Sequence, residues 1–245
     1  LKLARGPYSY LFESVQGGEK WGRYSLIGLP SSTVLKVFGD QLLIEKNGEV
    51  LVSRTTADPL KDVEDFHAEY KMPELPQLPR FTGGLVGYFG YDTVRYVEPR
   101  LKGSVPKDDL GNPDILLMAS DEVVIFDNLM GKLIFVVHGD AADPNAWSKA
   151  QSRLDELGTK LKHSLPDLPP VNLEGGGLDE SAFVSSFGEE NYKAAVDKIK
   201  DYILAGDVMQ VVPSQRMSMN FDVEPLNLYR ALRCLNPSPY MYFLD

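Results

Sequence analysis

Residues 189–205 carry apolar side chains at the spacing of a helix. The apolar positions lie four, three and four residues apart and so share one face: Tyr192, Val196, Ile199 and Ile203. Ser186, followed three residues later by Glu189, fits a capping box, in which two side chains satisfy free backbone amides of the first turn. Gly206 suits the left-handed residue that ends many helices. We therefore predict a capped helix over 189–205.

A β-branched run follows this helix at Val208–Val212 and predicts a strand. One amide, Gln210, lies inside the run. A buried amide costs free energy unless it is hydrogen-bonded, so Gln210 either supports a neighbouring backbone or faces a polar cavity. The apolar pattern leaves both interpretations open.

The residues before 140 form short apolar runs separated by turn residues, and Asn47-Gly48 is a strong hairpin signal between two of them. Predicted strands cover 8–15, 21–29, 33–38, 41–46, 49–54, 81–91, 115–118, 122–127 and 132–138. Predicted helices cover 58–70, 144–162 and 225–235. We place Trp147 and Leu157 on the buried stripe of the second helix and Cys234 on the apolar face of the third. Strands in runs, rather than alternating with helices, favour an α+β fold with antiparallel sheets.

Residues 165–177 contain Pro166, Pro169 and Pro170 and three consecutive glycines. No regular element accommodates this composition, so the stretch predicts a linker. We therefore expect an N-terminal region over 1–164, a linker over 165–185 and the start of a second region over 186–245.

Charge and cysteine content narrow the class of protein. The net charge of −10 argues against a nucleic-acid partner, which requires a basic face to offset phosphates. No apolar run reaches the roughly 20 residues that span a bilayer, so we expect no membrane segment. Cys234 is the single cysteine, which excludes an intrachain disulfide and suits a cytoplasmic protein. The three histidines are scattered, and we expect no metal site within these residues.

Four stretches together resemble one enzyme family. Residues 206–216 read GDVMQVVPSQR, residues 11–14 read LFES, residues 22–28 read GRYSLIG and residues 236–243 read NPSPYMYF. Along the chain, these stretches follow one another as in the N-terminal half of the large subunit (component I) of anthranilate synthases. The chain thus resembles this part of the chorismate-utilising enzyme family. The chain does not begin with methionine and stops at Asp245, directly after an apolar run, which we interpret as an internal fragment of a longer protein.

The resemblance implies a fold and an activity. The expected fold is an α/β/β/α sandwich, with antiparallel sheets packed face to face and helices outside, here truncated. The expected reaction joins chorismate to ammonia and releases pyruvate to give anthranilate, for tryptophan biosynthesis. The family uses Mg²⁺, whose ligands we expect beyond Asp245, and ammonia from a glutamine amidotransferase small subunit. We therefore expect the 245 residues alone to be inactive.

The resemblance also implies a tryptophan site for feedback inhibition. The matching positions are Ser14, Pro239, Tyr240 and Met241, with Phe12, Glu13, Arg23 and Asn236 nearby. These residue types suit a free amino acid. A guanidinium and a hydroxyl donate to its carboxylate, a carboxylate accepts from its ammonium, and apolar side chains contact its indole.

Gln210 matches a catalytic position of the family. Related isochorismate synthases carry a lysine there, which activates water. A neutral amide cannot act as that base, so glutamine is consistent with ammonia as the nucleophile. Aminodeoxychorismate synthases also carry glutamine and remain an alternative, although they tend to have a Phe-Ser-like pair in place of Tyr240-Met241. A non-catalytic amino-acid-sensing module is the second alternative.

Overall fold

The computed structural model describes residues 3–4, 6–14, 22–73, 75–105, 107–163 and 179–245. The chain divides into two compact units. The first comprises Leu1–Leu168 together with Tyr229–Asp245, and the second comprises Pro169–Leu228. The last strand of the chain therefore belongs to the same unit as the first strands.

The elements follow in chain order. The strands are β1 (Tyr10–Glu13), β2 (Tyr24–Gly28), β3 (Thr33–Phe38), β4 (Gln41–Lys46), β5 (Glu49–Thr55), β6 (Gly84–Phe89), β7 (Ile115–Ser120), β8 (Glu122–Asp127), β9 (Lys132–Val137), β10 (Val184–Ser185), β11 (Met217–Ser218) and β12 (Met241–Leu244). The α-helices are α1 (Pro59–Ala68), α2 (Val94–Val97), α3 (Ala146–His163), α4 (Glu189–Ala205) and α5 (Pro225–Leu235). Short 3₁₀ turns are η1 (Tyr91–Thr93), η2 (Pro99–Ser104) and η3 (Glu180–Ala182).

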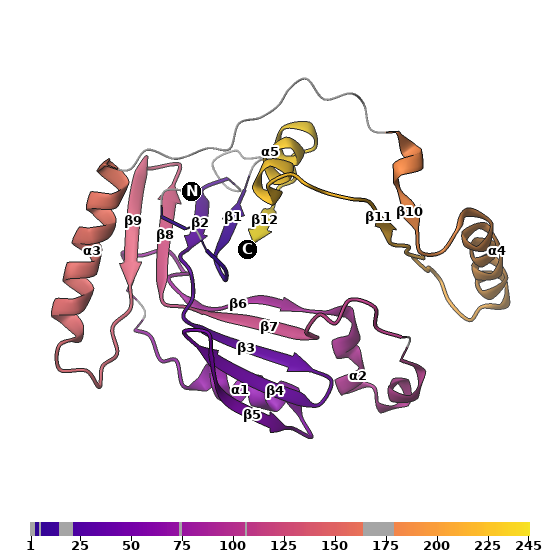
Figure 1. Cartoon of the computed structure of the whole chain (residues 1–245), viewed down its shortest axis with the longest axis horizontal. Coiled ribbons are helices and arrows are strands. Elements are labelled where there is room, and N and C mark those ends of the chain that lie inside the picture. Colours follow the sequence, from indigo (N-terminus) through magenta and orange to yellow (C-terminus); the bar gives the residue numbers. More distant parts are fainter. Residues whose placement is uncertain (1–2, 5, 15–21, 74, 106, 164–178) are drawn as a thin grey trace. The chain divides into compact units, whose positions relative to one another are not determined.

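Two antiparallel sheets form the first unit (Figure 1). One has the strand order β12-β1-β2-β8-β9, and the other has the order β5-β4-β3-β7-β6. Every neighbouring pair in both sheets is antiparallel. The strand β12 comes from the end of the sequence and pairs with β1 from its beginning.

The two sheets pack face to face through a shared apolar cluster. Tyr10 of the first sheet joins Val34, Val86 and Met118 of the second, and the Tyr10 hydroxyl lies 2.8 Å from the Ser120 hydroxyl. Burial raises the pKa of Tyr10 to about 12. Gly28 pairs with Tyr10, and a Cβ there would lie only 1.8 Å from the tyrosine ring, so this position requires glycine.

Helices cover the outer faces of both sheets. Val63 and Phe66 of α1 pack on the second sheet in the cluster that contains Leu35 and Ile115. Leu157 of α3 packs on the first sheet against strands that include β8 and β9. This arrangement confirms the predicted α+β sandwich of face-to-face antiparallel sheets with outer helices.

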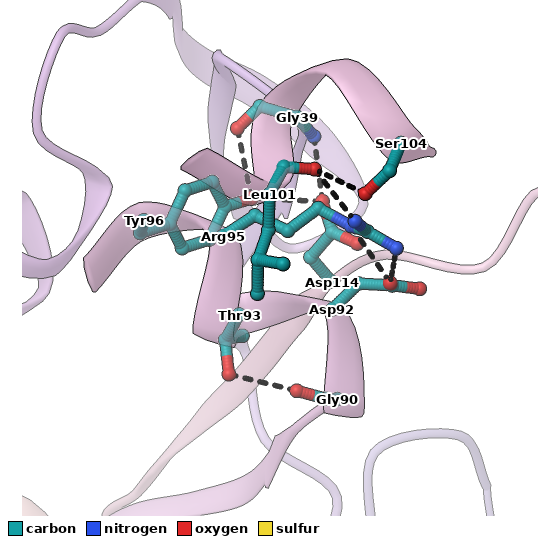
Figure 2. Close-up of polar contacts among 9 residues, drawn as sticks. All are labelled: Gly39, Gly90, Asp92, Thr93, Arg95, Tyr96, Leu101, Ser104 and Asp114. Carbon is teal, nitrogen blue, oxygen red and sulfur yellow. Dashed lines mark hydrogen bonds and ion pairs between the residues drawn. The ribbon is translucent and has the colours of Figure 1, made fainter. Parts of the chain in front are cut away.

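A polar cluster holds the segment from η1 to η2 at one end of the second sheet (Figure 2). The Tyr96 hydroxyl lies 2.8 Å from both the Gly39 carbonyl oxygen and Asp114 Oδ2, and the same carboxylate oxygen accepts the Gly39 amide at 2.7 Å. Arg95 pairs with Asp92 and donates to the Leu101 carbonyl at 2.9 Å. Burial, together with the Asp114 carboxylate, raises the pKa of Tyr96.

The second unit contains η3, β10, α4 and β11 and the first residues of α5. The helix predicted over 189–205 is confirmed as α4, and Gly206 ends it with φ 82° and ψ 12°. The predicted capping box is wrong. The N-cap is Gly188, and the Ser186 hydroxyl instead accepts the Arg216 amide at 3.1 Å, because the short β10–β11 pairing brings these two segments together.

The strand predicted over Val208–Val212 is also wrong, since these residues form irregular chain. Met209 is 96% exposed and Val212 is 79% exposed. β-Propensity reflects packing against neighbouring strands, and no described strand pairs with this run. Pairing instead begins later, at Met217 of β11.

Two side chains predicted to be buried are exposed. Trp147 is 77% exposed because α3 packs on the sheet through Leu157 and Leu161, three turns further along. Cys234 is exposed because α5 turns Tyr229 toward the sheet and Cys234 lies five residues later, on another side of the helix.

Candidate functional site

The first and last parts of the chain meet at the β1–β12 ladder. Glu13 pairs with Met241, and Phe12 pairs with Tyr242. Just beyond this pairing, the Ser14 hydroxyl donates to the Pro239 carbonyl oxygen at 2.8 Å. Residues 225 positions apart in the sequence are therefore in direct contact, and the structure brings two of the predicted tryptophan-site stretches together.

The pleat of β1 divides the predicted site residues between two faces. Tyr10 and Phe12 face the second sheet, and side chains alternate along a strand, so Glu13 points to the outer face. Met241 pairs directly with Glu13 and shares that outer face, where it is buried. Phe12 and Tyr242 lie opposite each other on the inner face.

Glu13 is held by two side chains of α5. The Tyr229 hydroxyl donates to Glu13 Oε2 at 2.8 Å, and Arg233 Nε donates to the same oxygen at 3.1 Å. Burial and the Glu13 carboxylate both raise the pKa of Tyr229, so the phenol stays protonated as a donor. We call Glu13, Tyr229 and Arg233 the Glu13 cluster.

Sequence reasoning missed Tyr229 and Arg233. They lie four residues apart within a helix that the sequence predicts, so they share one face of it. A tyrosine and an arginine four residues apart on a predicted helix indicate two hydrogen-bond donors on one face. Their acceptor, Glu13, lies more than 200 positions earlier, and only the folded chain identifies it.

Arg23 precedes β2 at the same end of the first sheet as Ser14. Its guanidinium binds Asp127 through both Nε and Nη2, with the shortest distance at 2.8 Å. The Asp127 carboxylate also accepts the backbone amides of Leu129 and Met130. These contacts hold the pKa of Asp127 below its usual range, the Arg23 hydrogen bond being the largest cause.

The remaining predicted tryptophan-site residues lie in the short connection between α5 and β12. Asn236 directly follows α5, and its backbone amide donates to the Leu232 carbonyl at 2.9 Å. Pro239 and Tyr240 precede β12, and Tyr240 is 69% exposed. The connection therefore presents its side chains to solvent, while its two ends are fixed by α5 and β12.

Gln210 lies in the second unit, in the irregular chain between α4 and β11, and is exposed. The exposure of Gln210 contradicts the expectation that its amide is buried inside a strand.

Within the described residues, no group of three or more His, Cys, Asp or Glu side chains could hold a metal ion. Nor is any helix in that part of the chain long and apolar enough to cross a membrane.

Residues 12–245 match the family described as chorismate binding enzyme. The chain belongs to this family. The match spans both compact units, so the resemblance seen in four short stretches extends over almost the whole sequence.

Proteins named anthranilate synthase component 1 are similar to this chain throughout its length. The one from Pseudomonas aeruginosa is 57% identical over 245 residues, and the one from Neisseria gonorrhoeae is 53% identical over 248 residues. All of this chain is covered in both comparisons, but only 50% and 49% of the respective relatives. The chain thus spans about half the length of these relatives.

A solved structure has the same fold. The crystal structure of anthranilate synthase component I from Streptococcus pneumoniae TIGR4 matches with a TM-score of 0.69 and 26% sequence identity. The match covers 91% of this chain and 48% of that one. The predicted resemblance to the large subunit of anthranilate synthases is therefore confirmed in both sequence and structure.

Proposed function

We propose that this chain is part of an anthranilate synthase large subunit. The observation that carries the proposal is the identity of up to 57% with proteins named anthranilate synthase component 1, over the full length of the chain. The proposed reaction takes chorismate and ammonia to anthranilate, pyruvate and water, in tryptophan biosynthesis. A glutamine amidotransferase small subunit supplies the ammonia, and the enzyme acts in the cytoplasm.

The proposed regions follow from the composition of residues 165–177 and from the family resemblance. By sequence we keep an N-terminal region over 1–164, a linker over 165–185 and the start of the chorismate-binding region over 186–245, whose last strand joins the first sheet. Residues 165–178 of the linker lie outside the described residues. We place the Mg²⁺ ligands of the complete subunit outside these 245 residues. Gln210 keeps its proposed catalytic position, where a neutral amide is compatible with ammonia as nucleophile.

The proposed regulatory ligand is tryptophan, bound around Ser14 and the connection after α5. The contact between the Ser14 hydroxyl and the Pro239 carbonyl supports this location, because it places a hydroxyl donor beside the segment that carries Tyr240 and Met241. Phe12 offers an apolar wall. Arg23, Glu13 and Asn236 complete the proposed surroundings of the site.

An activity assay with two proteins tests the proposal. The complete subunit that contains these residues is incubated with chorismate, ammonia and Mg²⁺, and anthranilate is followed by its fluorescence while pyruvate is quantified. We expect equal amounts of both products from the complete subunit and none from the 245-residue chain. Tryptophan should inhibit the reaction, and glutamine should replace ammonia only when the small subunit is added.

The alternative functions give different products. Aminodeoxychorismate without release of pyruvate would contradict the proposal in favour of an aminodeoxychorismate synthase. Tryptophan binding by the complete protein without conversion of chorismate would favour an amino-acid-sensing module.

A further inference from the structure

The Glu13 cluster connects the edge of the first sheet to α5. Its two hydrogen bonds, from Tyr229 at 2.8 Å and from Arg233 at 3.1 Å, end on one carboxylate oxygen. The Glu13 side chain is 17% exposed and Tyr229 is buried, so solvent competes little for this carboxylate. Hydrogen bonds to an ionised acceptor are stronger than those between neutral groups, which makes the cluster a firm attachment for α5.

The position of this attachment matters for residues 236–240. This connection begins where α5 ends and finishes where β12 starts. The cluster fixes the helix end, and the ladder with β1 fixes the strand end, where Met241 pairs with Glu13 itself. The Tyr229 ring also contacts the Phe243 ring of β12, with centroids 5.8 Å apart. Both ends of a five-residue connection are thus held through contacts to Glu13 or its partners.

Glu13 is poorly placed to contact a ligand bound beside Ser14. Its carboxylate lies on the outer side of the sheet, as Met241 does, but one of its oxygens already accepts hydrogen bonds from both Tyr229 and Arg233 of α5. A carboxylate that binds an ammonium ion would have to turn away from both α5 donors. Tyr229 and Arg233 would then lose their shared acceptor, and the buried Tyr229 hydroxyl would be left unsatisfied, at a cost in free energy.

We propose that Glu13 is a positioning residue of the tryptophan site and not a ligand. Through Tyr229 and Arg233 it holds α5, and α5 sets the position of residues 236–240, including the Pro239 carbonyl that Ser14 contacts. The inference rests on the proposed function and concerns how its regulatory site is built.

Binding measurements on the complete subunit test this role with two probes. One is tryptophan, and the other is indole-3-propionate, which lacks the α-amino group. Dissociation constants are measured by calorimetry for the unmutated protein, Glu13→Gln, Tyr229→Phe and the double variant. Tyr229→Phe removes only the hydroxyl and keeps the ring that contacts Phe243.

We expect each single variant to weaken both probes about three- to tenfold, because Glu13→Gln replaces a charged acceptor by a weaker neutral one and Tyr229→Phe removes one hydrogen bond. The double variant should lose less than the sum of the two single effects, because both substitutions act on the contact between Tyr229 and Glu13. Leu232→Ala, at an exposed position of α5, is the matched control and should leave both dissociation constants unchanged. Melting temperatures confirm that every variant is folded.

A direct ligand role would give a different pattern. If Glu13 binds the ammonium, Glu13→Gln weakens tryptophan but not indole-3-propionate, and Tyr229→Phe has little effect on either. That pattern overturns the inference, as does unchanged binding in both single variants. If the unmutated subunit binds no tryptophan, the proposed regulatory site fails as well. Formation of anthranilate in the same preparation shows whether the proposed activity stands independently.

Discussion

Single side chains determine whether the β1–β12 junction can serve as a binding site. Ser14 is the central one, because its hydroxyl is small, lies beyond the end of β1 and already contacts the connection after α5. Its removal breaks the hydrogen bond to the Pro239 carbonyl oxygen but none of the backbone pairing between β1 and β12.

We therefore predict that Ser14→Ala in the complete subunit weakens inhibition by tryptophan. The loss of one hydrogen bond to a charged ligand group costs about 1.5–3 kcal/mol, which is roughly a ten- to hundredfold change in affinity. The measurement is the tryptophan concentration that halves activity, alongside uninhibited turnover. Ser53→Ala, at an exposed position of β5, is the control. Loss of turnover with unchanged tryptophan affinity would show that the site is misassigned.

Arg23 and Asp127 determine acid stability at the same end of the sheet. The pKa of Asp127 is lowered in the folded state, so its stabilising effect is complete above the ordinary carboxyl pKa of about 4. This stability is lost as the pH falls through the lower folded-state value. We predict that Asp127→Asn destabilises the chain at pH 7 and flattens the fall of its melting temperature below pH 4. Arg23→Gln should also reduce the fall of the melting temperature at low pH. If this fall is unchanged in both variants, the Arg23–Asp127 pair does not determine acid stability.

At the scale of elements, short helical turns depend on polar contacts more than on burial. None of the residues of η1, α2 and η2 is buried. Arg95 links η1 to η2 within the segment, and the Tyr96 hydroxyl attaches the segment to Gly39 and Asp114. By contrast, α1 and α3 are held through apolar side chains on the sheets.

We predict that Tyr96→Phe loosens the segment from 91 to 104 without unfolding the sheets. The hydroxyl contacts both Gly39 and Asp114, so its removal should cost about 1 kcal/mol. Hydrogen exchange followed by mass spectrometry should show faster exchange in this segment and unchanged exchange in β3 and β7. Tyr91→Phe is the matched control, since Tyr91 is 92% exposed. Equal exchange in all three proteins would mean that the cluster does not hold the segment.

At the scale of the molecule, apolar surface is unevenly distributed. The largest exposed apolar side chains include Leu204, Met209, Val212, Leu235, Tyr240 and Tyr242. β12 lies at the edge of its sheet within the described residues, so its outer backbone groups are available for pairing. Exposed edges and apolar surface together favour association between chains.

We predict that the 245-residue chain self-associates at micromolar concentrations. Light scattering coupled to size exclusion should show species heavier than the 27.3 kDa monomer. Tyr242→Lys should reduce association, because a charge on an edge strand opposes pairing. A single monomer peak at all concentrations, with one cooperative melting transition, would contradict this prediction.

Local patterns in the sequence determined most elements and the class of the fold. The helix over 189–205, the hairpins of the second sheet and the opening of α5 at Pro225 follow from periodicity, turn residues and proline geometry, which act over a few residues. The four family stretches also predicted, from sequence alone, that Ser14 and residues 236–241 belong to one site. Such signals are readable because their physical causes are local.

Tertiary structure alone decided which distant residues meet. The irregular chain at Val208–Val212 has strand composition but no described partner strand, so its propensity has nothing to pack against. The pleat of β1 turned Glu13 toward α5 and left Phe12 on the other face, and pairing with β12 put Ser14 beside Pro239. These contacts depend on strand register across more than 200 residues, which no local pattern encodes.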